Sequence, residues 1–121
     1  MLKLILFLVR KPGLSAADMR THYETVHVPL VRKIFPQIVE HRRNYPDPDG
    51  AFFPPGVSVP SWDVIAEMWI TDRAGLEAML AHQSDPVAGA ELVADESSFL
   101  DRGKCGMLIV DENIGAGARK P

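Results

Sequence analysis

The opening residues of the chain constrain its fold more than any other part of the sequence. Residues 2–10 form a short apolar run, and Pro12-Gly13 follows it, so the run predicts a β-strand. Successive side chains of a strand point to opposite faces of its sheet, which divides the run into two sets. The sets are Leu2, Leu4, Leu6 and Leu8 on one face and Ile5, Phe7 and Val9 on the other. Because both sets are apolar, this strand needs a covering layer on each face of its sheet.

The rest of the sequence predicts helices and three more strands. A helix should start at the N-cap Ser15 and end or kink at about residues 26–28, because Pro29 follows. The other expected elements are strands at 37–45, 62–70 and 104–110, a helix from Thr71 or Asp72 to Gln83, and a helical stretch from Pro86 to Phe99. This β-α-β-β-α-β order predicts an α+β fold of the ferredoxin-like type, with a four-stranded antiparallel sheet.

The two-sided first strand also predicts how the chain assembles. Right-handed crossovers place the helices of this fold on one face of the sheet, so the other face is left bare. A second copy of the chain, packed sheet against sheet, would cover that face, and we expect a homodimer. The folded domain should comprise residues 1–112, and the glycine- and alanine-rich residues 113–121 should form a flexible tail.

Length, charge and cysteine content exclude several classes of protein. A chain of 121 residues suits one domain, and its 13 basic and 16 acidic residues are interspersed, so no nucleic-acid partner is expected. The single cysteine, Cys105, excludes an intrachain disulfide and a cysteine-rich zinc site. The apolar run at residues 4–9 is shorter than a signal sequence or a membrane span requires. We therefore expect a cytoplasmic protein without membrane contact.

The densest group of polar residues lies between His22 and Pro29. In a regular helix Tyr23 lies near the middle of the apolar stripe, and His22 and His27 lie about 140° apart on opposite flanks. That separation is poor for chelating one metal ion, so no metal is expected. A neutral imidazole facing a pocket between helix and sheet could act as a general acid or base near pH 7. The alternative is that both histidines are partly exposed and bind the kinked backbone.

Two other pairs of residues are candidates for contact with a substrate. Glu67 and Trp69 share a face of the predicted strand at 62–70, where a carboxylate needs a partner or shifts its pKa. An ion pair of Glu67 with Arg42 or Arg43 is the structural alternative. Phe52 and Phe53 lie in a long proline-rich loop at 46–60. They should cover the pocket mouth or the dimer partner, unless the prolines merely stiffen an exposed loop.

Three blocks of the sequence resemble the EthD domain family. They are Phe7 to Ser15 leading into His22-Tyr23-Glu24-x-x-His27-Val28-Pro29-Leu30, then Asp63 to Trp69, and then Ala94-Asp95-Glu96-x-x-Phe99-Leu100-Asp101. The resemblance spans about residues 1–112, although the loop at 46–60 is longer and richer in proline than is typical of the family. It implies a dimeric α+β barrel with a mostly apolar pocket, suited to enolising or oxidising small cyclic substrates. It also implies His22, Tyr23 and His27 as site residues.

Three functional hypotheses follow. The first is an enzyme without cofactor, of cyclase, isomerase, dehydratase or monooxygenase type, acting on an aromatic, polyketide-like or lactone substrate. In it His27 or His22 transfers a proton, and Tyr23 donates a hydrogen bond to a developing enolate oxygen. The second is a haem-dependent oxidoreductase of the same architecture with His27 as axial ligand. The third is a non-catalytic dimer that binds small hydrophobic molecules.

Overall fold

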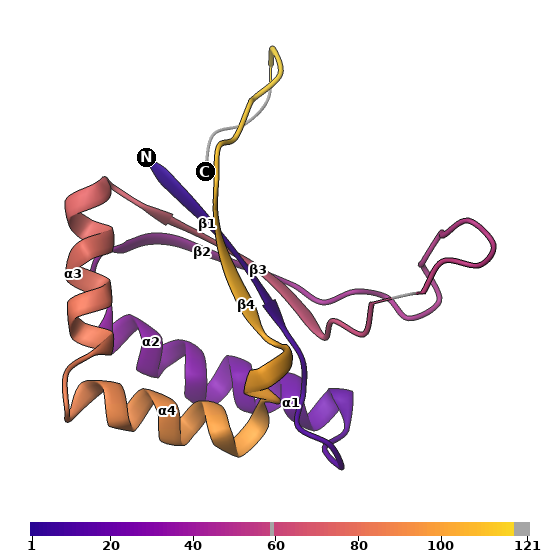
Figure 1. Cartoon of the computed structure of the whole chain (residues 1–121), viewed down its shortest axis with the longest axis horizontal. Coiled ribbons are helices and arrows are strands. Elements are labelled where there is room, and N and C mark those ends of the chain that lie inside the picture. The colour runs from indigo at the N-terminus through magenta and orange to yellow at the C-terminus, as the bar shows by residue number, and fades with distance from the viewer. Residues whose placement is uncertain (59, 118–121) are drawn as a thin grey trace.

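Four antiparallel strands form one sheet in the order β2-β3-β1-β4, and the helices pack on one of its faces (Figure 1). The computed structural model describes residues 1–58 and 60–117. The strands are β1 (Leu2–Leu8), β2 (Ile38–Asn44), β3 (Val64–Ile70) and β4 (Gly106–Val110). The helices are α1 (Ala16–His22), the π-helical segment η1 (Tyr23–His27), α2 (Val28–Ile34), α3 (Arg73–Gln83), α4 (Ala88–Phe99) and the 3-10 turn η2 (Arg102–Lys104). The element order confirms the predicted ferredoxin-like α+β fold.

Strand β1 lies between β3 and β4, and the helices cover one of its two apolar faces, as the sequence predicted. Leu4 and Leu8 are buried against the helices, and their antiparallel partners on β3, Met68 and Val64, are buried beside them. Helices α2, α3 and α4 cover one end of this face, and α1, η1 and the end of α4 cover the other. Burying a leucine or methionine side chain in this way contributes about 1.5–3 kcal/mol each.

Among the described residues, no helix covers the second face of the sheet (Figure 1). Ile5 and Phe7 of β1 lie there, beside Ile65 of β3 and Leu108 of β4, and Leu108 is 55% exposed. Trp62 packs on Phe7, with ring centroids 4.6 Å apart. An apolar surface of this kind is typical of a protein–protein interface, as the two-sided strand predicted.

Glu67 and Trp69 also lie on this second face. Glu67 forms an ion pair with Lys3 at 3.0 Å, so the structural alternative of an ion pair holds, with Lys3 as the partner in place of Arg42 or Arg43. The guanidinium of Arg42 lies over the ring of Trp69 instead, 4.9 Å from its centroid. The side chain of Arg43 points to the helical face of the sheet, because its partner on β3 is Ala66, which is buried on that face.

The proline-rich segment between β2 and β3 extends away from the rest of the domain (Figure 1). Phe52 is 93% exposed and Phe53 is also exposed. Among the described residues of one chain, neither phenylalanine lines the cavity between the helices and the sheet, and their contact with a partner stays a prediction. Residues 118–121 of the predicted tail lie outside the described residues.

The uncovered face generates a prediction about assembly. The wild-type chain should be a dimer at micromolar concentration by light scattering. Leu108→Glu should shift it to monomer, because the new carboxylate would be desolvated between two sheets.

The matched control is Val87→Glu, which places the same charge at a residue that is 77% exposed at the start of α4. This variant should stay dimeric. A monomeric wild-type protein would contradict the prediction, as would a Leu108→Glu variant that dimerises normally.

Candidate active site

The helix that begins at Ala16 changes its hydrogen-bond pattern before Pro29. Proline has no N–H, and its ring excludes the carbonyl four residues earlier from the usual helical position. Residues Tyr23–His27 form a π-helical segment, in which the N–H of Val28 donates to the carbonyl of Tyr23, five residues earlier. The helical path continues into α2, with Pro29 in its first turn. The expected end or kink at Pro29 is therefore a change of helix type.

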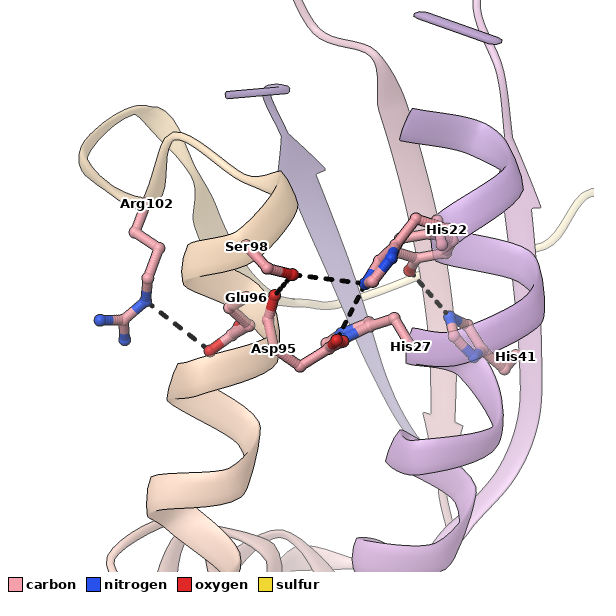
Figure 2. A network of polar contacts seen from close by, with 8 residues as sticks. His22, His27, His41, Asp95, Glu96, Ser98 and Arg102 are labelled. Atoms are coloured by element: carbon pink, nitrogen blue, oxygen red, sulfur yellow. Dashed lines mark hydrogen bonds and ion pairs between the residues drawn. The ribbon is translucent and has the colours of Figure 1, made fainter. Parts of the chain in front are cut away.

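The π-helical segment brings two histidines to the same carboxylate. Residues five apart lie about one turn apart in a π-helix. His22 Nε2 lies 2.8 Å from Asp95 Oδ1, and His27 Nδ1 lies 2.8 Å from Asp95 Oδ2 (Figure 2). The prediction that His22 and His27 occupy opposite flanks was wrong, because it assumed α-helical spacing throughout.

Asp95 fixes the orientation and the tautomer of His27. An ionised carboxylate only accepts hydrogen bonds, so Nδ1 of His27 carries the proton that it donates to Asp95. In a neutral imidazole the other nitrogen, Nε2, then has a free lone pair. Nε2 has no hydrogen-bond partner within the part of the chain that the structure describes, and the His27 side chain lines a cavity. A buried imidazole in this state can accept a proton from a ligand.

The cavity lies between the helices and the sheet and has a volume of about 260 Å³. Most of its wall is apolar, which suits a small hydrophobic ligand. The apolar lining residues are Leu6, Leu8, Val31, Phe35, Met68, Leu76, Met79, Leu80, Leu92, Leu100 and Met107. The polar and ionisable lining residues are Tyr23, His27, Gln83, Glu96, Arg102 and Cys105.

Tyr23 and His41 form a buried pair next to His27. The Tyr23 hydroxyl lies 3.4 Å from His41 Nε2, and the rings of Tyr23 and His27 are 5.4 Å apart. Burial, together with the positive charges of Arg43 and Arg32, lowers the pKa of His41 to about 4. Burial also raises the pKa of the Tyr23 hydroxyl. Near pH 7, His41 is therefore neutral and Tyr23 keeps its proton.

A charged cluster fastens the π-helical segment to strand β2. Arg43 donates to both carboxylate oxygens of Glu24, at 3.0 and 2.8 Å, and the Tyr45 hydroxyl also donates to Glu24. These hydrogen bonds from Arg43 and Tyr45 lower the pKa of Glu24 to about 2. Arg20 lies over the ring of Tyr45, 4.1 Å from its centroid. Because Glu24 follows Tyr23 and Arg43 lies two residues after His41, the cluster keeps Tyr23 close to His41.

Sequence reasoning missed Asp95 and Glu96 as site residues. Both lie on α4, between the buried residues Leu92 and Phe99. A spacing of three or four residues places them near the buried side of the helix. Two carboxylates next to an apolar stripe were the signal that could have identified them.

The structure does not bring every predicted site residue to the cavity. His27 and Tyr23 line it, whereas His22 is not part of the cavity wall and contacts Asp95. Glu67 and Trp69 lie on the opposite face of the sheet, because successive side chains of β3 point to opposite faces and Met68, between them, points to the helices. Phe52, Phe53, Glu67 and Trp69 could therefore contact a ligand only in a cavity of a second chain.

Residues 1–58 and 60–117 include no helix with the length and apolar character that a membrane crossing needs. In the same described residues, no group of three or more His, Cys, Asp or Glu side chains is placed to hold a metal ion.

Comparisons with known proteins agree with the architecture. The model of the EthD domain family matches residues 11–103. An EthD family protein of Bacillus halodurans is similar in structure, with a TM-score of 0.61 and 21% sequence identity over 93% of this chain and 100% of that chain. HapK of Hahella chejuensis has a TM-score of 0.64 and 17% identity, and the match covers 100% of both chains. A protein of Arabidopsis thaliana has a TM-score of 0.64 and 13% identity over 96% of this chain and 99% of that chain. At these identities the likeness concerns the fold alone. Curated protein sequences yield no match.

The buried His41 generates a prediction about acid stability. Its pKa is about 4 in the folded chain and about 6.5 in the unfolded chain, so between these values the unfolded state binds more protons. The free energy of unfolding should therefore fall by about 3 kcal/mol through this group as the pH drops from 6.5 to 4. The charged neighbours that contribute are Arg43, Arg32, Glu24 and His27.

Urea denaturation at several pH values measures this effect. His41→Gln should flatten the decline between pH 6.5 and 4, because glutamine does not titrate. His82→Gln is the control and should follow the wild-type curve, because His82 is exposed. A His41→Gln curve parallel to wild type would show that His41 does not carry the effect.

Proposed function

Because the chain belongs to the EthD domain family, we propose that it is a small-molecule enzyme that moves protons by histidine chemistry in the cavity between helices and sheet. The observation that carries the proposal is the His27–Asp95 pair: a buried imidazole, oriented by a carboxylate, lines a mostly apolar cavity. The substrate class that this chemistry favours is a small aromatic, polyketide-like or lactone compound with an acidic C–H next to a carbonyl. The reaction needs no cofactor.

His27 acts as the general base in this proposal. Its Nε2 takes a proton from the substrate, and Asp95 stabilises the imidazolium that forms, as the carboxylate does in other carboxylate–histidine pairs. His22 is the weaker candidate, because its Nε2 is already bound to Asp95. Its role is to hold the second oxygen of that carboxylate in place.

Tyr23 stabilises the negative charge that develops on the substrate oxygen. A neutral His41 has one N–H, and placing it on Nε2 lets it donate to the Tyr23 hydroxyl oxygen. The other tautomer would leave a buried N–H at Nδ1, which has no partner among the described residues. Unpaired buried N–H donors are rare. With Nε2–H donating, the hydroxyl hydrogen of Tyr23 is free to point into the cavity and bind an oxyanion.

The proposed assembly is a cytoplasmic homodimer with sheet packed against sheet, as in a dimeric α+β barrel. The partly exposed apolar face formed by Ile5, Phe7, Ile65 and Leu108 supports it. Such a dimer would leave both cavities on the outer, helical sides. It would also place Glu67, Trp69 and the arm that carries Phe52 and Phe53 near the partner.

The two other hypotheses have less support. A haem would need the same Nε2 of His27, but the cavity of about 260 Å³ is smaller than the roughly 300–1,000 Å³ that drug-sized ligands occupy, and a porphyrin is larger than most of these. A non-catalytic binding protein has no need for a carboxylate-oriented imidazole in its cavity. Absence of turnover in the experiment below would favour that alternative.

Exchange of carbon-bound hydrogen tests the proposed base. Wild-type protein should speed the exchange of the α-protons of 2-tetralone, a small aromatic ketone, for deuterium in D2O, as followed by proton NMR. His27→Gln should slow this exchange by roughly 10²- to 10⁴-fold, because the base is removed. Tyr23→Phe should have a smaller effect, since one hydrogen bond is lost.

His82→Gln serves as the control for loss of a surface imidazole, and circular dichroism establishes that each variant is folded. Retention of exchange activity in a folded His27→Gln variant would contradict the assignment of the base. A wild-type protein that fails to speed the exchange would contradict the proposed function itself.

A further inference from the structure

A second ionisable group faces the cavity and has no role in the proton abstraction described above. Glu96 follows Asp95 on α4, and neighbouring residues of a helix point about 100° apart. Asp95 therefore turns towards the histidines, while Glu96 lines the cavity and turns towards Arg102 (Figure 2). The Glu96 side chain is 22% exposed.

The contact of Glu96 with Arg102 is loose. Arg102 Nε lies 3.7 Å from Glu96 Oε1, beyond the usual hydrogen-bond distance, and the Arg102 side chain is 49% exposed. The charge of an exposed guanidinium is weakened by solvent. Within residues 1–58 and 60–117 the Glu96 carboxyl has no hydrogen-bond partner, so it is available to a ligand in the cavity.

The surroundings of Glu96 favour its protonated form. Burial raises its pKa, and the neighbouring charge of Asp95 raises it further, against the opposite effects of His27 and Arg102. Burial also raises the pKa of the Cys105 thiol, a cavity neighbour, so the thiol adds no negative charge near pH 7. A positive charge on His27 lowers the pKa of Glu96. Arrival of a proton at His27 therefore favours departure of the proton from Glu96.

We propose that Glu96 is a second catalytic residue, the proton donor that acts together with the base His27, and that the cavity takes carbonyl compounds with a hydroxyl group at the β-position. This inference rests on the proposed function. His27 removes the α-proton, and Tyr23 binds the resulting enolate oxygen. The electrons then form the α,β double bond, the C–O bond to the β-hydroxyl breaks, and Glu96 protonates that oxygen. The products are water and the unsaturated carbonyl compound, and proton return from His27 to Glu96 through solvent restores the enzyme.

One probe separates the two steps. 3-Hydroxy-1-phenylpropan-1-one exchanges its α-protons in D2O by action of the base alone, and loses water to give phenyl vinyl ketone when an acid also acts. Glu96→Gln should lower the rate of water loss roughly 10²-fold more than it lowers the rate of α-proton exchange. His27→Gln should lower both rates. Glu91→Gln, on the exposed side of α4, is the control and should change neither.

The outcomes distinguish this inference from the proposed function. Exchange that depends on His27, with water loss unaffected by Glu96→Gln, would overturn the role of Glu96 and leave the base in place. Absence of exchange in wild-type protein would overturn both. Equal losses of exchange and water loss in Glu96→Gln would indicate a structural role and would also overturn the assignment.

A measurement without substrate tests the coupling between the two groups. Carbon-13 NMR of the glutamate carboxyls, with the Glu96 signal assigned by its loss in Glu96→Gln, follows the titration of Glu96. Its midpoint should lie above that of an ordinary glutamate and should rise further in His27→Gln, because the positive charge is removed. A midpoint at or below the ordinary value would overturn the inference.

Discussion

The carboxylate of Asp95, shared between His22 and His27, is the interaction on which the site depends. Each of its oxygens receives one imidazole N–H at 2.8 Å, which connects helix α4 to the π-helical segment. Ser98 adds a contact to His22 at 3.5 Å. The arrangement exists because Pro29 cannot continue an α-helix in the usual register, so the preceding turn widens and a five-residue spacing becomes one turn. The π-helical segment therefore positions both histidines against Asp95.

The rest of the domain supports this contact from both sides. The cluster of Glu24, Arg43 and Tyr45 fastens the π-helical segment to β2, and buried Phe99 packs against the rings of His22, Tyr23 and His27. The π-helical segment and α4 are therefore held together by Phe99 as well as by Asp95, and the segment is also bound to β2. Rigid support of this kind lowers the cost of holding an imidazole in one orientation during proton transfer.

The sequence was sufficient to predict the fold, because alternation along β1 and β3 and helical spacing elsewhere report burial directly. The resemblance to the EthD domain family also pointed to Tyr23 and His27, and the structure places both side chains at the cavity wall. The sequence did not reveal the hydrogen-bond register before Pro29, which hydrophobic spacing does not encode, so His22 and His27 were assigned to opposite flanks. The contacts of His27 with Asp95 and of Glu67 with Lys3 join segments that are far apart in the sequence. Local residue spacing does not show which of several carboxylates or lysines will be the partner.

The central claim is that Asp95 holds His27 with its proton on Nδ1 and a free lone pair on Nε2. Nitrogen-15 NMR of the histidine rings, at a pH where the imidazoles are neutral, distinguishes the two tautomers directly. We expect a protonated Nδ1 and an unprotonated Nε2 for His27 in wild-type protein, and loss of this single tautomer in Asp95→Asn. A proton on Nε2 of His27, or a rapidly exchanging mixture unaffected by Asp95→Asn, would contradict the claim.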